Sequence, residues 1–181
     1  MDAYVENDRL GAVVAPRTVR IERLLPGPVD RVWSYMVNSE KRKKWLAEGP
    51  MADHVGGDVV LTFHNGEISD ETVPDKYKQY EKHVNRCRIL RYEPPHLLSM
   101  TWPQGEGEPS EVTFELAASG TDTLLTITHS RLAHRDAMIS VSGGWHSHLA
   151  ALIDVLNGRK VDGFWKKLAE VEAQYRQTIV D

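Results

Sequence analysis

Apolar and polar positions alternate near the start of the chain. In residues 17–25 (RTVRIERLL), Val19 and Ile21 fall on one side of an extended backbone, and the polar residues between them fall on the other. Successive side chains of a β-strand point to opposite faces of a sheet, so this alternation predicts a half-buried strand. Residues 1–16 carry only a weak pattern, and we expect them to form an N-terminal arm that is either disordered or lies along the first strand.

A run of further strands is predicted in the middle of the chain, with turn residues between the segments. The segments are residues 58–63, 83–93, 97–102, 111–118 and 123–132. Strands joined by short turns favour an antiparallel meander. Asn65-Gly66 is typical of a hairpin turn after the first of these segments. Residues 67–82 are polar and lack a clear period, and we interpret them as an excursion or a lid.

Two short helices are predicted between the first two strands. Pro28 is well placed at a helix start, and the apolar residues after it keep the i, i+3, i+4, i+7 spacing of one helix face. These residues are Val29, Val32, Trp33 and Met36. Asn38 or Ser39 can cap a second short helix over residues 40–47 (EKRKKWLA). We interpret its basic residues as the solvated face of that helix, with Trp45 on the other side; a partner surface is the alternative.

The period becomes helical for the rest of the chain after Leu132. Residues three and four positions apart form a single apolar stripe, which comprises Trp145, Leu149, Leu152 and Leu156. Asn157-Gly158 is a good pair to end this helix. A second helical segment is predicted at residues 164–178. The apolar face of a curved antiparallel sheet must pack against another element, and the helix that contains Trp145 and Leu156 is long enough to cover it. The order of elements predicts an α+β fold, with residues 17–181 in a single domain.

Composition narrows the class of protein. The 181 residues are 41% hydrophobic and 27% charged, which is ordinary for a globular domain. A net charge of −4 argues against a nucleic-acid partner, which requires a basic surface. The chain has neither an apolar run of the ~20 residues that span a membrane nor a signal-peptide pattern, so we expect no membrane partner. The single cysteine excludes an intrachain disulfide, and together these features favour the cytoplasm.

No motif for a metal, a cofactor or covalent catalysis is present. His146 and His148 are two residues apart on a helix and therefore point in different directions. We expect His146 at the surface or an edge, whereas His148 flanks the apolar stripe, about 60° from its centre. Cys87 alternates with arginines, so it is expected to face the apolar side of its strand as an inert thiol.

The order of these segments resembles the SRPBCC superfamily, whose START-like members have a helix-grip fold. The chain looks most like the branch named for the C-terminal domain of the heat-shock-protein-90 ATPase activator. The matching stretches are residues 29–46, Gly56-Gly57, 88–102, 112–132 and 143–158. The resemblance implies a curved antiparallel sheet wrapped around a long C-terminal helix, often with a cavity between them. It implies one of three functions: binding of a small hydrophobic ligand, a co-chaperone role with a heat-shock ATPase, or a polyketide cyclase or aromatase activity.

We predict non-catalytic binding of a small hydrophobic molecule between the sheet and the helix. The residues expected to contact it are Phe63, Met100, Trp102, Phe114, His129, Trp145, His148, Leu149 and Leu152. The alternative is that these side chains pack on one another and leave no space, which is favoured near the middle of the helix. For the tryptophans and histidines both interpretations stay open. An enzyme would use His129 or His148 as acid or base. A chaperone partner, and a homodimer formed through residues 164–178, are further alternatives.

Overall fold

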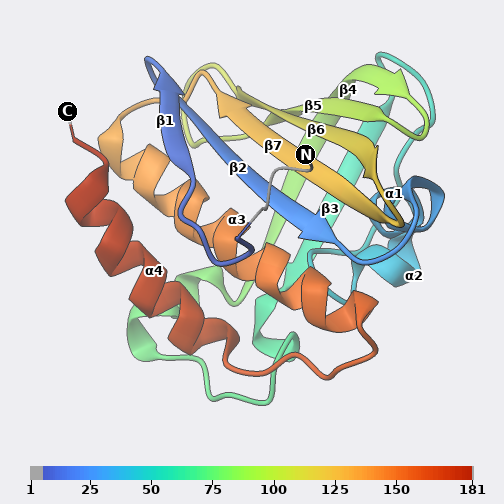
Figure 1. Cartoon of the computed structure of the whole chain (residues 1–181). Helices are drawn as coiled ribbons and strands as arrows, with labels where there is room; N and C mark the ends of the chain where they lie inside the picture. Colours follow the sequence, from blue (N-terminus) through green and yellow to red (C-terminus); the bar gives the residue numbers. More distant parts are fainter. Residues whose placement is uncertain (1–5, 181) are drawn as a thin grey trace.

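The structure, a computed structural model, describes residues 6–180. Within that range, seven antiparallel strands form one curved sheet in the order β1-β2-β7-β6-β5-β4-β3 (Figure 1). The strands are β1 (Ala12–Ala15), β2 (Thr18–Leu25), β3 (Asp58–His64), β4 (Lys82–Glu93), β5 (Leu97–Trp102), β6 (Ser110–Ser119) and β7 (Asp122–Ser130). Strands β4 to β7 are neighbours both in sequence and in the sheet, so the predicted antiparallel meander is confirmed.

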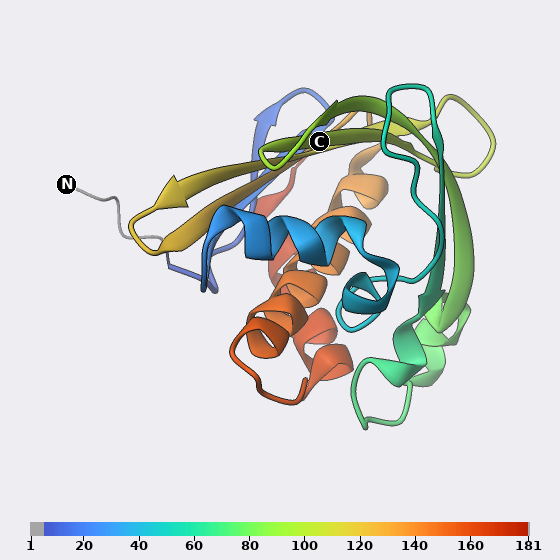
Figure 2. The same ribbon diagram turned by 90° about the vertical axis from the view of Figure 1, so that its right-hand side faces the viewer.

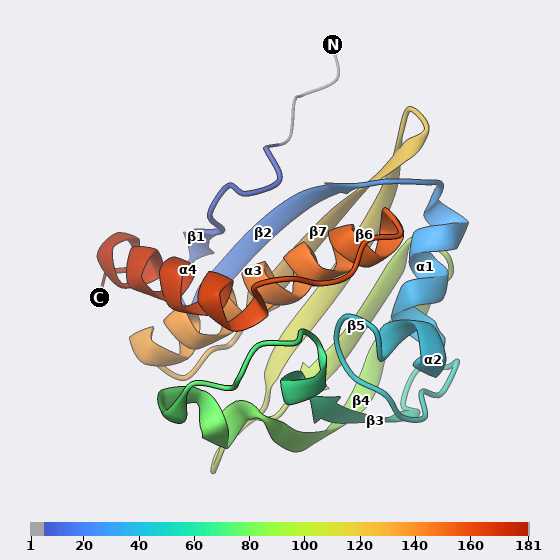
Figure 3. The ribbon, with the colours of Figure 1, turned by 90° about the horizontal axis from the view of Figure 1, so that it is seen from below.

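The helices lie on the concave side of this sheet (Figure 2). They are α1 (Val29–Val37), α2 (Ser39–Arg42), α3 (Arg135–Leu156) and α4 (Phe164–Thr178). Helix α3 crosses the concave face, and α4 packs along α3 (Figure 3). Asn157 caps the C-terminus of α3 as expected, and Gly158 follows it with a φ of 69°. The α+β helix-grip fold predicted from the sequence is confirmed.

The core fills the space between α3 and the sheet. Cross-strand pairs such as Val112 with His129 and Phe114 with Ile127 place their side chains on the concave face, where all four are buried. The other side chains predicted to point inward are also buried, except Trp102, which is half-buried. The period of two along the strands therefore identified the buried face of the sheet correctly.

The prediction of a hairpin at Asn65-Gly66 is wrong. Strands β3 and β4 do pair antiparallel, but two 3-10 helices connect them, η1 (Asn65–Glu67) and η2 (Asp75–Tyr80). The connecting segment is not polar throughout, because the Tyr77 side chain is buried. An Asn-Gly pair favours a two-residue turn only when the strands on both sides continue in register, and here the second strand begins only at Lys82.

The basic run after α1 also differs from expectation. Helix α2 ends at Arg42, and Asn38 caps its N-terminus by accepting a hydrogen bond from the backbone N–H of Lys41. Arg42 is buried rather than solvated, and its guanidinium donates to the carbonyl oxygens of Ala47 and Gly49 at 3.0 Å and 2.6 Å. This arginine stabilises an irregular turn, because it satisfies carbonyl groups that no helix or strand uses.

Part of the predicted N-terminal arm lies along the first strand. Residues 12–15 form β1 and pair with β2, and the side-chain amide of Asn7 bonds both the N–H and the C=O of Leu24 further along β2. Residues 1–5 of the arm lie outside the described residues.

Candidate functional site

A pocket of about 390 Å³ lies at one end of the sheet–helix interface. Its walls come from the ends of β3, β4 and β5, from the N-terminal half of α3, from α4 and from residues 65–80. Figure 3 shows residues 65–80 beside α4, and residues of both segments line the pocket. The side chains of the sheet and of α3 do not fill the space between them here.

Four of the nine predicted contact residues line this pocket: Phe63, Trp102, Trp145 and His148. Their rings form a continuous wall. The ring centres of Trp102 and Trp145 are 5.2 Å apart, and the Phe63 ring centre lies 6.1 Å from that of Trp102 and 6.1 Å from that of His148. These rings come from β3, β5 and α3, which only the folded sheet brings together.

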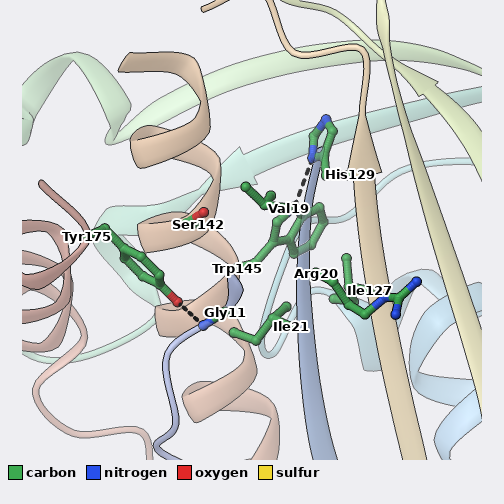
Figure 4. Close-up of a pocket in the computed structure, with 9 residues that line it drawn as sticks. All are labelled: Gly11, Val19, Arg20, Ile21, Ile127, His129, Ser142, Trp145 and Tyr175. Carbon is green, nitrogen blue, oxygen red and sulfur yellow. Dashed lines mark hydrogen bonds between the residues drawn. The ribbon is translucent and has the colours of Figure 1, made fainter. Parts of the chain in front are cut away.

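The other five predicted residues lie in the packed core outside this pocket. Met100 and Phe114 border a void of only about 10 Å³, and Leu149 and Leu152 have no solvent exposure. His129 borders a second void of about 10 Å³ between β2, β7 and α3 (Figure 4). Voids of this size hold at most one water molecule. Along the middle of α3, the side chains of helix and sheet therefore pack directly on one another.

His129 is held in a chain of hydrogen bonds. Its Nδ1 accepts from the indole N–H of Trp145 at 3.1 Å, because an indole nitrogen can only donate (Figure 4). The proton of the neutral ring is then on Nε2, which donates to Oγ of Ser110 at 2.8 Å; the Ser110 hydroxyl donates in turn to the carbonyl of Trp102. Burial lowers the pKa of His129 to about 3. Both nitrogens are occupied, which disfavours acid or base chemistry near neutral pH.

His146 is buried, and the expectation of a surface position was wrong. Its Nδ1 lies 3.1 Å from the hydroxyl of Tyr175 on α4, and that hydroxyl also accepts a hydrogen bond from the backbone N–H of Gly11 (Figure 4). Burial is the main reason that the pKa of His146 falls to about 3, and the positive charge of Arg23 adds to it. Helix α4 and the N-terminal arm cover the side of α3 that a single C-terminal helix would leave in solvent.

His148 presents a free acceptor at the pocket. Its Nδ1 lies 2.7 Å from the carbonyl oxygen of Trp45, which can only accept, so Nδ1 carries the proton of the neutral ring. Burial lowers the pKa of His148 to about 4, although the Trp45 carbonyl acts in the opposite direction. The lone pair of Nε2 has no hydrogen-bond partner among the described residues.

Sequence reasoning missed the wall formed by α4 and the segment between β3 and β4. Its ring residues are Tyr77, Tyr80, Phe164 and Trp165, and His83 at the start of β4 adjoins them. The Tyr77 ring stacks on Trp165 with centres 5.6 Å apart, and its hydroxyl donates to Glu172 of α4 at 3.1 Å. The two tyrosines in an otherwise polar segment were the available signal, because large aromatic side chains are seldom left fully in solvent.

The carboxylate of Glu71 attaches this segment to α4. It accepts hydrogen bonds from the backbone N–H groups of Trp165 and Lys166 at 2.8 Å and 3.2 Å. Helix N-termini carry unpaired N–H groups and a partial positive charge, so a carboxylate stabilises them. The residue at the N-cap itself, Gly163, has no side chain to do this.

Several buried polar atoms around the pocket have no hydrogen-bond partner within the part of the chain that the structure describes. They are Oδ1 of Asn65, Nδ1 of His83 and Nε1 of Trp165. Unpaired buried polar groups are rare in native proteins, and water or a ligand usually satisfies them. Across residues 6–180, there is no group of three or more His, Cys, Asp or Glu side chains placed to hold a metal ion. No helix in that range is both long and apolar enough to cross a membrane.

Solved structures with the same fold support this architecture. A protein from Bordetella parapertussis, solved by solution NMR, shares 43% identity with a TM-score of 0.81 over 94% of this chain and 91% of that one. CalU16 from Micromonospora echinospora shares 22% identity with a TM-score of 0.69 over 91% and 89%. The Aha1 dimer from Colwellia psychrerythraea shares 15% identity with a TM-score of 0.58 over 77% and 95%.

The comparison with curated proteins found no match. The family model described as activator of Hsp90 ATPase homolog 1-like protein matches residues 26–157, which span most of the chain, from the start of α1 to the end of α3. The chain therefore belongs to the activator of Hsp90 ATPase homolog 1-like family, within the SRPBCC superfamily.

Proposed function

We propose that the protein binds a small, mainly apolar molecule in the pocket between the end of the sheet, α3 and α4, without transforming it. The observation that carries this proposal is a space of about 390 Å³ lined by aromatic side chains from the sheet, α3, α4 and residues 65–80. Binding sites for small molecules are typically concave, mostly apolar and about 300–1,000 Å³ in volume, with a few polar groups that orient the ligand. The three unpaired buried polar atoms around the pocket are suited to that orienting role.

A catalytic role has less support from the same residues. Both nitrogens of His129 are engaged in hydrogen bonds, and its ring lies outside the pocket. His148 lines the pocket, but a histidine with a pKa of about 4 is a weak base at neutral pH. A co-chaperone role rests on the family description alone. The homodimer stays a prediction. Sedimentation of the purified protein tests it, because it measures the mass of the particle in solution.

Gly144 offers a direct test of the pocket. It lies on α3 at the pocket wall, and a Cβ at this position would meet no heavy atom within 4 Å. Gly144→Phe should therefore place a ring in the pocket, whereas Gly144→Ala leaves the space open and raises helix stability by about 0.5–1 kcal/mol.

The experiment has two parts. Native mass spectrometry of the purified protein detects a co-purifying molecule, and calorimetric titration with an uncharged naphthalene probe measures binding. We expect the wild type and Gly144→Ala to bind the probe and Gly144→Phe to lose at least about tenfold in affinity, which corresponds to about 1.4 kcal/mol. Equal binding by all three proteins would place the ligand elsewhere. Absence of both a co-purifying molecule and probe binding in the wild type would overturn the proposed function.

A further inference from the structure

Aromatic rings from both the sheet and the α4 side line the pocket. On the sheet side, Phe63 stacks on His83 with ring centres 4.2 Å apart and planes within 8° of parallel. On the α4 side, Tyr77 stacks on Trp165. Aromatic rings attract other rings through offset stacking and edge-to-face contacts, which an aliphatic chain cannot make. These rings therefore favour a flat aromatic occupant over an alkyl chain.

Among the residues that line the pocket, His148 has one ring nitrogen engaged with the backbone and the other, Nε2, without a hydrogen-bond partner among the described residues. The Trp45 carbonyl holds the proton on Nδ1, and the rings of Phe63 and Phe164 flank the imidazole with centres 6.1 Å and 5.0 Å away. The orientation of the ring is thus set from several sides, and its free nitrogen is an acceptor. An acceptor on a buried side chain is unfavourable without a partner, and a ligand that donates a hydrogen bond would remove this cost.

The charges around the pocket disfavour an anion. Its charged lining residues are Asp136, Glu172 and Arg176, and the guanidinium of Arg176 already lies 3.0 Å from the carboxylate of Glu172. A ligand carboxylate would meet two protein carboxylates and one cation that is already paired. It would also lose its hydration on entering a space lined mainly by rings, which is costly without an opposite charge.

We infer that the ligand is an uncharged aromatic molecule with a hydrogen-bond donor, such as a phenol, whose hydroxyl donates to Nε2 of His148. This inference deepens the proposed function and rests on it. It names the donor-bearing ring as the feature that the pocket selects, and it separates this protein from carriers of fatty acids, whose ligands are anionic.

Three compounds that share one ring system provide the test: naphthol, its methyl ether and naphthoate. Naphthol can donate, the ether can only accept, and naphthoate is an anion at neutral pH. Calorimetric titration of the purified wild-type protein should show naphthol binding about tenfold more tightly than the ether, and naphthoate more weakly than both. Equal affinity for naphthol and the ether would overturn the inference, and so would a preference for naphthoate.

Variants of two histidines locate the acceptor. His148→Phe keeps a ring of similar size and should abolish the preference for naphthol over the ether, while His54→Phe, at an exposed position that does not line the pocket, should retain that preference. His148→Asn provides a second variant if His148→Phe does not fold, because its amide can still donate to the Trp45 carbonyl but does not extend to the position of Nε2. Survival of the preference in a folded His148 variant would overturn the assignment.

Failure of ligand binding and failure of donor selection by His148 give different results. If naphthol and the ether bind equally and Gly144→Phe excludes both, the pocket binds aromatic molecules but His148 does not select a donor, and only the inference fails. If none of the three compounds binds the wild type and no molecule co-purifies, the proposed function fails as well.

Discussion

Trp145 of α3 donates its indole N–H to Nδ1 of His129 on β7 at 3.1 Å, and this contact fixes the tautomer of a histidine with no solvent exposure. The relationship couples the helix to the sheet, because Nε2 of the same imidazole donates to Ser110 on the neighbouring strand. Trp145 thus has two functions in the fold: its ring borders the pocket, and its nitrogen completes a polar chain inside the core.

Truncation of Trp145 separates these two contributions. We expect Trp145→Ala to lower the free energy of unfolding by about 3–5 kcal/mol, because it removes a large buried side chain. Trp145→Phe should cost about 1–3 kcal/mol, since it keeps a ring but leaves Nδ1 of His129 unpaired. Urea unfolding followed by circular dichroism measures both. Val84→Ala, at an exposed position on β4, should stay within about 0.5 kcal/mol of the wild type. A loss below about 1 kcal/mol for Trp145→Ala would mean that this side chain contributes little to the core.

Stability should fall as the pH is lowered below neutrality. Burial lowers the pKa of His129 and His146 to about 3 and that of His148 to about 4, whereas a histidine in an unfolded chain titrates near 6.5. Between these values the unfolded state binds more protons, so the free energy of unfolding decreases with falling pH, by up to about 1.4 kcal/mol per pH unit for each histidine.

Unfolding curves between about pH 7 and pH 5 measure this dependence. The slope of unfolding free energy against pH reports the number of protons taken up on unfolding. His129→Gln should lower that number by about one, because glutamine can accept and donate hydrogen bonds but does not titrate. His54→Gln, at an exposed position, is the matched control and should leave the slope unchanged. An unchanged slope in His129→Gln would show that this ring is not neutral and buried over the whole range.

The Glu71 carboxylate should stabilise the start of α4. Glu71→Ala removes the acceptor for the N–H groups of Trp165 and Lys166, and we expect a loss of about 1–2 kcal/mol together with faster hydrogen exchange at these two amides. Glu67→Ala, at an exposed position in the same segment, is the control for removing one negative charge. If exchange at the two amides did not change, the contact would be too weak to join this segment to α4.

Gly49 occupies a position that excludes any side chain. Its φ is 127°, and a Cβ there would lie 2.1 Å from the carbonyl oxygen of Val60. Gly107 has a similar φ of 141°, but a Cβ at that position would meet no heavy atom within 4 Å. Both alanine variants carry backbone strain, but only Gly49→Ala adds a clash. The loss of unfolding free energy, measured by thermal unfolding, should therefore be about 1–3 kcal/mol larger for Gly49→Ala than for Gly107→Ala. Equal losses would show that the chain around Gly49 can move away at little cost.

Local sequence patterns predicted the elements of this fold well. The helix expected at residues 164–178 has those limits in the structure, and the alternation in residues 17–25 identified the buried positions Val19 and Ile21 of β2. Arg23 shares the face of Val19 and Ile21 by the same alternation, and it is buried. Its burial was not predicted, because charged residues are usually exposed to solvent.

The candidate site was only partly predictable. His148 was expected near a cavity and lines the pocket, whereas His146 was expected at the surface and is buried under α4. The two positions differ in what covers them. Tyr175 of α4 contacts both His146 and the backbone N–H of Gly11, and these residues are far apart in the chain. The pocket wall formed by Tyr77 and Trp165 depends on contacts of the same kind.

By itself, the sequence determined the strands, the helices and the apolar face of each, because periods of two and 3.6 residues express local backbone geometry. The tertiary structure alone decided where the sheet–helix interface is filled and where it is open. That outcome depends on where the side chains of α3 and the sheet meet and on which distant segments cover the remaining space. Neither property leaves a periodic signal in the chain, because both arise from packing between residues that are remote in sequence.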